Sequence, residues 1–140
     1  ALDKCKPSIA YNIQELQLEG KSVIAMHIEE GKEKPYASLD QEGKWLAYVR
    51  VADSNVLANW VWLQVIKQKH KMLNIKLEYH GLDEIVLKFI SENAMSTQRS
   101  IAKGLKANYR KVGNTLVKLV GMGIVNMEIT KDGTFFSIAD

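Results

Sequence analysis

The segment of residues 109–120 constrains the fold of this 140-residue chain more than any other, because its side chains divide between two faces of a helix. At about 100° per residue, one face is apolar and consists of Tyr109, Val112, Leu116, Leu119 and Val120. The opposite face carries cations and one amide: Arg110, Lys111, Asn114 and Lys118. Asn108 is suited to cap the start of this helix, and Gly123 to follow its end. The pattern predicts a helix with one buried and one cationic face.

Two more helices are expected before this segment and a hairpin after it. Asp83 can cap a helix that carries apolar residues at i, i+1, i+4 and i+5. Ser96 is a suitable N-cap for a second helix, whose inward residues are Ile101, Ala102 and Leu105. Residues 124–139 are rich in β-forming residues, and Asp132-Gly133 is a strong turn signal between two strands. The expected order is therefore helix, helix, turn, helix, hairpin.

Positive charge is concentrated in the same region, although the whole chain has a net charge of only +3. Residues 96–120 contain no acid and six cations: Arg99, Lys103, Lys106, Arg110, Lys111 and Lys118. Cations on a rigid element that also presents polar side chains are what DNA binding needs. A solvated basic surface without a partner is the alternative interpretation.

The N-terminal part is expected to be rich in β structure. Residues 8–52 contain β-forming runs separated by turn signals at Gly20 and Gly43. A helix is then expected over residues 56–71, with Asp53 or Ser54 as its N-cap. Apolar residues surround the axis of this helix, so the segment is either a strand or a helix buried by a missing upstream segment or a second subunit. The expected oligomer contacts are Trp60, Trp62 and Ile66.

Residues 82–139 resemble the winged-helix DNA-binding domains of bacterial transcriptional regulators, on the strength of the helix spacing, the cap at Asn108, the "GIV" segment at 123–125 and the hairpin. In that arrangement the third helix reads bases and the second crosses the backbone. Arg110 and Asn114 are assigned to base edges, where Arg suits guanine and Asn suits adenine. The expected phosphate and backbone contacts are Gln98, Arg99, Lys103, Tyr109, Lys111, Lys118 and Lys131. Tyr109 is equally suited to packing at the edge of the core.

Residues 8–59 resemble a second family, the C-terminal half of the Schlafen/Alba-like DNA-binding domain of bacterial regulators, some of which are described as ATP-binding or RecG-helicase-related. The residues that carry the resemblance are "GKSVIAMHIEEGKEKPYA" (20–37) and "AYVRVADSNVLAN" (47–59). The upstream half of that family, with an acidic motif and paired glycines, is not in this sequence, so no nucleotide-binding or nuclease activity is carried over from it. Because the chain starts at Ala1 without methionine, we expect an internal fragment or a processed product with a segment missing upstream.

Enzymatic and metal chemistry find little support in the sequence. The three histidines are scattered, the single cysteine is Cys5, and no P-loop, GxSxG or GxGxxG motif occurs. We therefore expect no catalytic residues, no metal and no cofactor. Arg50 is the polar residue of the first region to watch, either as an anion contact or as an ion-pair partner of Asp53 or Asp40. No apolar run reaches the roughly 18 residues of a membrane span, so we expect a cytoplasmic protein.

These expectations combine into an α+β fold. A small mixed or antiparallel β-rich part with a helix occupies residues 1–72, a linker residues 73–80, and a winged helix-turn-helix residues 81–140. The expected function is a DNA-binding transcriptional regulator, a homodimer on double-stranded DNA whose N-terminal part dimerises or senses. Two alternatives remain open: the C-terminal part of a Schlafen-like nuclease or nucleotide-binding protein, and a protein–protein interaction module.

Overall fold

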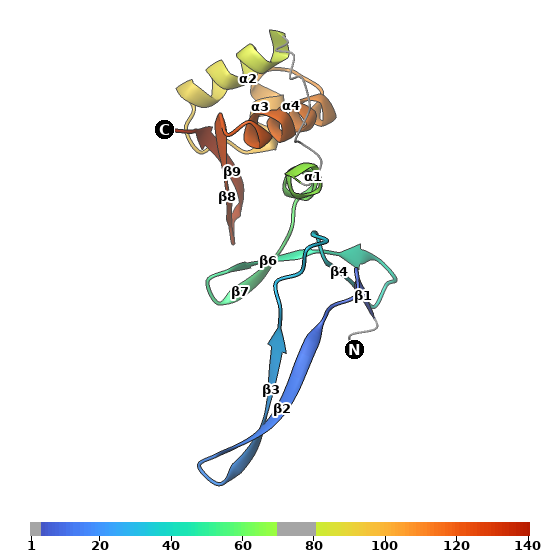
Figure 1. Cartoon of the computed structure of the whole chain (residues 1–140). Helices are drawn as coiled ribbons and strands as arrows, with labels where there is room; N and C mark the ends of the chain where they lie inside the picture. Colours follow the sequence, from blue (N-terminus) through green and yellow to red (C-terminus); the bar gives the residue numbers. More distant parts are fainter. Residues whose placement is uncertain (1–3, 70–80) are drawn as a thin grey trace. The chain divides into compact units, whose positions relative to one another are not determined.

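The fold is α+β, with four helices and several small antiparallel sheets in the part that the computed structural model describes, residues 4–69 and 81–140 (Figure 1). The chain forms two compact units, Ala1–Ala47 and Tyr48–Asp140. The expected linker at 73–80 lies outside the described residues, and the domain bounds 1–72 and 81–140 stay a prediction. None of the helices described is long and apolar enough to cross a membrane.

The first unit contains a three-stranded antiparallel sheet in the order β1-β4-β5. Its strands are short: Cys5–Lys6 (β1), Ala37–Leu39 (β4) and Trp45–Leu46 (β5). The expected bend at Gly43 between β4 and β5 is confirmed, with Gly43 at a φ of +79°. Asp40 stabilises this bend, because its Oδ1 accepts hydrogen bonds from the backbone N–H groups of Glu42 and Lys44.

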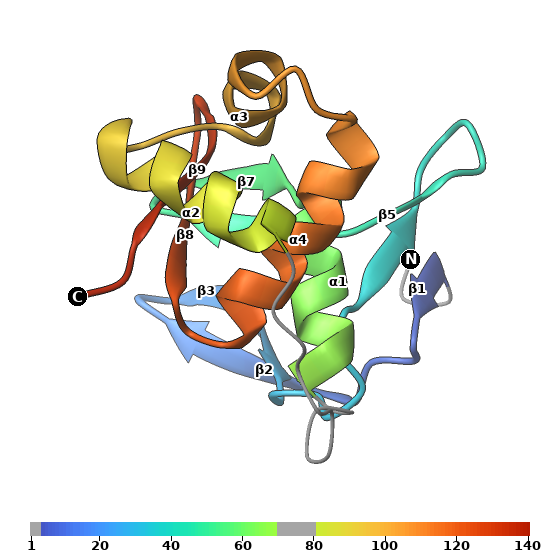
Figure 2. The ribbon, with the colours of Figure 1, turned by 90° about the horizontal axis from the view of Figure 1, so that it is seen from above.

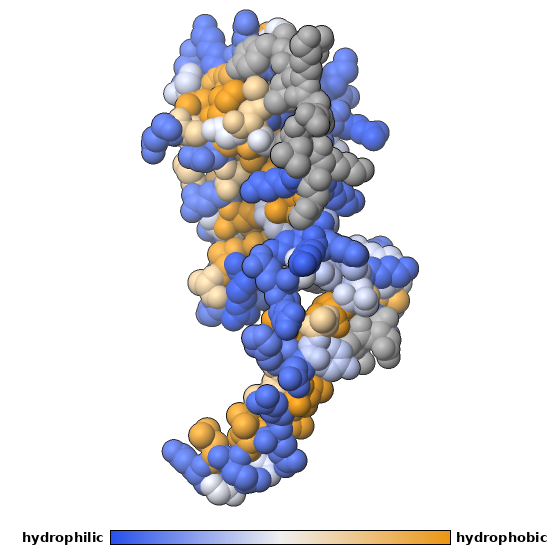
Figure 3. Space-filling view, viewed as in Figure 1, coloured by the Kyte–Doolittle hydropathy of each residue, from blue (hydrophilic) through white to orange (hydrophobic). Residues whose placement is uncertain are grey.

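A long hairpin makes up the rest of the regular structure in the first unit. Tyr11–Leu18 (β2) pairs with Lys21–Ile28 (β3) through all eight residues of each strand, with the expected turn at Gly20. Both faces of the hairpin are exposed, and hydrophobic side chains are visible along it (Figure 3). The large exposed hydrophobic residues on it are Tyr11, Ile13, Leu16, Leu18, Val23, Ile24, Met26 and Ile28. The buried hydrophobic cluster of the protein lies instead wholly in the second unit.

The second unit begins with a hairpin where the sequence predicted the start of a helix. Tyr48–Val51 (β6) pairs with Ser54–Leu57 (β7), so Ser54 and Asp53 do not cap a helix. The helix α1 runs over Trp60–Lys69, and its cap is Asn59, whose Oδ1 accepts a hydrogen bond of 2.7 Å from the Trp62 N–H. The expected N-cap was wrong because residues 54–57 form backbone hydrogen bonds with β6, which a helix starting there would exclude.

Three further helices enclose the core of the second unit: Gly81–Glu92 (α2), Gln98–Gly104 (α3) and Tyr109–Gly121 (α4). The helix α1 packs beside α4 (Figure 2), and its Val61 and Val65 are buried there. Part of the apolar surface of α1 is therefore covered by α4 of the same chain, a partner that the sequence did not suggest. The largest fully buried side chains of the unit are Phe136, Ile90, Ile101, Leu116 and Leu119.

The helix ends agree with the sequence at some positions and differ by a residue or two at others. Asn108 caps α4 and Gly123 follows its end at a φ of +74°, both as predicted. Thr97, not Ser96, caps α3, with a capping box between Thr97 and Ser100. Ser96 instead exchanges backbone hydrogen bonds of 3.1 and 2.8 Å with Phe136. Asp83 lies inside the first turn of α2, which begins at Gly81.

The predicted C-terminal hairpin is confirmed, with a shifted turn. Val125–Thr130 (β8) pairs with Gly133–Ile138 (β9). Thr130 is the partner of Gly133, so the two connecting residues are Lys131 and Asp132, not Asp132 and Gly133. Gly133 opens β9 at a φ of +149°, a value that a residue with a side chain rarely adopts.

Candidate nucleic-acid interface

The exposed face of α4 carries a small cluster of polar and cationic side chains. Arg110, Lys111 and Asn114 are all exposed, and their neighbours Val112 and Leu116 are buried. The Asn108 Oδ1 accepts hydrogen bonds from the backbone N–H groups of Arg110 (3.0 Å) and Lys111 (3.1 Å). The cap therefore fixes the first turn of α4, and with it the backbone from which both cations project.

A third face of α4, which the two-faced sequence pattern did not predict, is covered by α1. Gly113 and Val117 are buried on that face. A Cβ atom built on Gly113 would lie 2.6 Å from the Gln98 Nε2 and 3.1 Å from the Trp60 Cζ3. The glycine thus allows α1 and α3 to approach α4 closely, and a glycine inside an amphipathic helix was the signal that could have revealed it.

Lys118 takes part in the packing of the helices instead of facing solvent. Its Nζ lies 2.6 Å from the Asp83 Oδ2, and the two side chains are only 18% and 3% exposed. The pair joins α4 to the first turn of α2. This geometry argues against the predicted phosphate contact of Lys118, because its ammonium is engaged by a buried carboxylate.

The helix α3 contributes two exposed cations, Arg99 and Lys103. Gln98, also predicted to contact phosphate, is half-buried, and its Nε2 donates a hydrogen bond of 2.9 Å to the Tyr109 carbonyl. Its role in this structure is to hold the start of α3 against the start of α4. Tyr109 is 56% exposed, so it is available to a ligand at the N-terminal end of α4.

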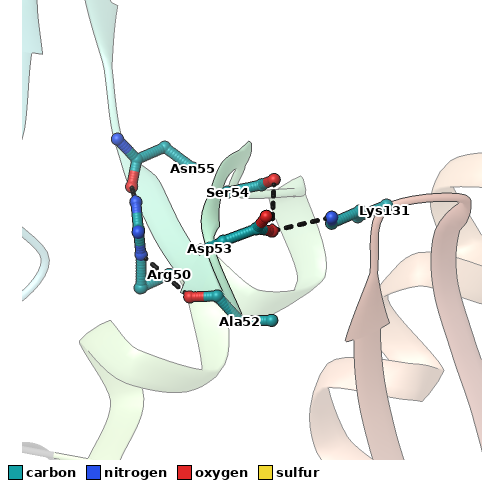
Figure 4. A network of polar contacts seen from close by, with 6 residues as sticks. All are labelled: Arg50, Ala52, Asp53, Ser54, Asn55 and Lys131. Atoms are coloured by element: carbon teal, nitrogen blue, oxygen red, sulfur yellow. Dashed lines mark hydrogen bonds and ion pairs between the residues drawn. The ribbon is translucent and has the colours of Figure 1, made fainter.

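Lys131 lies at the tip of the β8–β9 hairpin, where an acid from another hairpin contacts it. Its Nζ donates to the Asp53 Oδ1 at 2.8 Å, and Asp53 belongs to the turn between β6 and β7 (Figure 4). The pair is exposed, with 55% of the Lys131 side chain and 80% of the Asp53 side chain accessible. The hydrogen bond from Lys131 has the largest effect and the one from Ser54 the next largest, and both hold the pKa of the Asp53 carboxyl below its ordinary value.

Arg50 braces the turn that presents Asp53. Its Nε donates to the Ala52 carbonyl at 3.0 Å and its guanidinium to the Asn55 Oδ1 at 3.1 Å (Figure 4). Within the second unit its hydrogen-bond partners are thus Ala52 and Asn55 and not Asp53, so the predicted ion pair with Asp53 was wrong. Ala52 adopts a φ of +51°, and the bond from Arg50 to its carbonyl stabilises this left-handed residue of the turn.

The predicted oligomer contacts lie on α1 in different surroundings. Trp60 is 42% exposed and its ring lies against Gly113 of α4, whereas Trp62 and Ile66 are half-buried.

Within residues 4–69 and 81–140, no group of three or more His, Cys, Asp or Glu residues is arranged to hold a metal ion. The surface that the structure brings together is thus one of cations, amides and aromatic rings around the N-terminal ends of α3 and α4.

Comparison with known proteins gives one match. Residues 1–59 match the model of the family described as Schlafen, AlbA_2. No curated protein and no solved structure matches the chain. The matched segment covers the first unit and the β6–β7 hairpin and ends just before α1. Residues 1–59 are therefore similar to the Schlafen, AlbA_2 family.

Proposed function

We propose that the protein is a DNA-binding transcriptional regulator whose second unit binds duplex DNA as a winged helix. The helices α2, α3 and α4 would form the helical part, and the β8–β9 hairpin the wing. The backbone pairing of Ser96 with Phe136 supports this arrangement, because it adds a third short extended segment beside the hairpin. The order of α2, α3, α4 and the β8–β9 hairpin is that of the winged-helix domains that the sequence resembles.

The observation that carries the proposal is the set of exposed cations on consecutive elements of one compact unit. Arg110 and Lys111 project from the first turn of α4, Arg99 and Lys103 from α3, and Lys131 from the hairpin tip. Arg110 and Asn114 would read base edges, because Arg matches guanine and Asn matches adenine in the major groove. Lys111, Arg99, Lys103 and Lys131 would bind phosphates, with Tyr109 beside them. Gln98 and Lys118 are left out, because both are engaged within the protein.

The N-terminal match supports a nucleic-acid-related role and also a second candidate function. Residues 1–59 would be the C-terminal half of a Schlafen, AlbA_2 domain, serving for dimerisation or sensing in a cytoplasmic homodimer. The second candidate is the C-terminal part of a Schlafen-like nuclease or nucleotide-binding protein, and the same match favours it. A nuclease or nucleotide-binding assay on the protein, with and without any upstream sequence, separates the two.

The direct test is the double variant Arg110→Ala with Lys111→Ala, assayed by gel shift on duplex DNA. We expect affinity to fall by about tenfold or more, because one base contact and one phosphate contact are lost. The melting temperature should stay nearly unchanged, since both side chains are exposed.

The matched control is Lys67→Ala with Lys69→Ala, which also removes two positive charges, but from exposed positions on α1. Equal losses of affinity in the two double variants would leave only a general effect of net charge and refute the assigned face. A large fall in the melting temperature of the α4 variant would mean that the face is packed, as expected of a protein–protein interaction module.

A further inference from the structure

A cleft of about 450 Å³ lies in the second unit and shares Arg99, Tyr109 and Lys131 with the proposed duplex-binding face. Its lining comes from β7 and the start of α1, from the starts of α3 and α4, and from the β8–β9 turn and β9. The residues that matter here are Leu57, Trp60, Gln98, Arg99, Tyr109 and Lys131. The cleft therefore collects side chains from five elements of one compact unit.

Exposed aromatic and aliphatic side chains line this cleft. Trp60 is 42% exposed, Tyr109 56% and Leu57 53%. Two aromatic rings that are both partly exposed and line one cleft leave apolar surface for a flat ligand. The exposed parts of these rings suit a ligand with a flat π face.

Cations line the same cleft as the rings. Arg99 and Lys131 are both exposed there, with Lys131 in its exposed ion pair with Asp53, and Asp132 is the acid among the described lining residues. The side-chain amides of Asn59 and Gln98 also line the cleft, and each already makes one hydrogen bond within the protein. A ligand that suits this lining has an aromatic surface joined to a negative charge, and a nucleotide has both.

The aromatic rings that line the cleft favour unpaired over duplex nucleic acid. The volume of the cleft is within the range of sites for small ligands, about 300–1,000 Å³. A base pair within a stacked duplex presents only its edges, whereas an unpaired base exposes its faces to aromatic side chains. Stacking on Trp60 and Tyr109 thus requires a base outside the duplex.

We propose that this cleft binds an unpaired nucleobase of a nucleic acid, stacked on Tyr109 and Trp60, with Arg99 and Lys131 holding the adjoining phosphates. The proposal rests on the nucleic-acid function proposed above. It goes beyond that function, because it adds a binding site for an unpaired base to the proposed site for duplex DNA. Binding of duplex by α4 and of an unpaired base by the cleft would together favour a junction between double and single strands.

The test is fluorescence anisotropy with the full chain and a labelled oligothymidylate of about six nucleotides. The comparison probe is an abasic oligonucleotide with the same number of phosphates. We expect the oligothymidylate to bind about tenfold tighter than the abasic probe, because stacking needs the base and the charge is the same. Equal affinities would overturn the proposal.

Variants locate the base-dependent binding. Tyr109→Ala and Trp60→Leu should each remove most of the difference between the two probes, while Tyr109→Phe should keep it. The matched control is Tyr48→Ala, since Tyr48 is 50% exposed in the same unit and does not line the cleft. Trp60→Leu alters packing near Gly113, so Tyr109→Ala carries the test if that variant is unstable. A base-dependent difference that survives Tyr109→Ala would overturn the assignment to this cleft.

A blunt duplex measured in parallel separates the two proposals. Duplex binding together with equal affinities for the two single-stranded probes would refute the cleft and keep the duplex function. Base-dependent binding that Tyr109→Ala abolishes, without duplex binding, would support the cleft and refute the duplex function.

Discussion

At the scale of single residues, two polar side chains that the sequence predicted as phosphate contacts instead join helices within the second unit. Lys118 lies on the polar side of α4 by periodicity, yet it pairs with the buried Asp83 of α2. Gln98 is the first residue of α3, a position suited to a phosphate contact, yet its amide donates a hydrogen bond to the Tyr109 carbonyl. Periodicity places a residue on one face of its own helix, but it does not show which neighbouring element lies against that face.

Asp53 is the residue whose replacement we expect to strengthen DNA binding. Its carboxylate is paired with the Lys131 ammonium that would contact a phosphate, so DNA must displace the carboxylate to bind there. The variant Asp53→Asn should raise affinity for duplex DNA about two- to fivefold, the modest effect expected of an exposed ion pair. Gel shift at low salt measures the change.

Asp132→Asn is the control for this prediction, because it removes the same charge beside Lys131 without removing the observed ion pair. The gain should be smaller there and should disappear when Lys131→Ala is added to Asp53→Asn. A lowered pKa means that the Asp53–Lys131 contact persists above that pKa and is lost only as the pH falls through it. The effect of Asp53→Asn should therefore be constant from neutral to mildly acidic pH, and a change within that window would contradict the assignment.

At the scale of elements, α4 was predicted closely and its surroundings were not. Its bounds, its Asn108 cap and Gly123 follow from local chemistry, which one sequence window contains. The cover that α1 provides depends on residues some fifty positions upstream, and no local pattern encodes that contact. The structure reveals it through Gly113, which lies against Trp60 and Gln98.

Gly113→Ala should destabilise the protein, although alanine favours a helix over glycine by about 1 kcal/mol. The new methyl group would meet the Gln98 amide and the Trp60 ring at distances closer than normal contact. We expect a net loss of about 1–2 kcal/mol in the free energy of unfolding, as for other overpacked sites, measured by urea denaturation.

Gly81→Ala is the matched control, since a Cβ there has no atom within 4 Å among the described surroundings. It should be neutral or slightly stabilising. If Gly113→Ala stabilised the protein as much as Gly81→Ala, α1 and α3 would not pack against α4 as closely as described.

Several element ends were predicted one residue away from their observed positions, for a common reason. Ser96 and Thr97 are both good N-caps, and the pairing of Ser96 with Phe136 leaves Thr97 as the cap. In the hairpin, Gly133 is taken into β9 by its pairing with Thr130, which moves the turn to Lys131 and Asp132. In both cases residue type indicates the cap or turn only to within about one residue, and the backbone pairing of β9 with Ser96 and with β8 determines the exact position.

At the scale of the whole molecule, the two units differ in how they use apolar residues. The second unit contains the buried hydrophobic cluster, which its four helices and the β8–β9 hairpin form, while the long hairpin of the first unit leaves eight large hydrophobic residues exposed. The α+β class and the turns at Gly20 and Gly43 could be predicted from the sequence. The exposure of the β2–β3 hairpin could not, because alternation of side chains does not indicate whether either face is covered.

The central claim is that the second unit binds duplex DNA through cations from three elements. The most direct measurement is the dependence of duplex affinity on salt, by gel shift of the unaltered chain. With Arg99, Lys103, Lys111 and Lys131 on phosphates, the slope of log affinity against log salt should be about −3 to −4. Absence of binding at about 50 mM salt, or a slope near zero, would contradict the account.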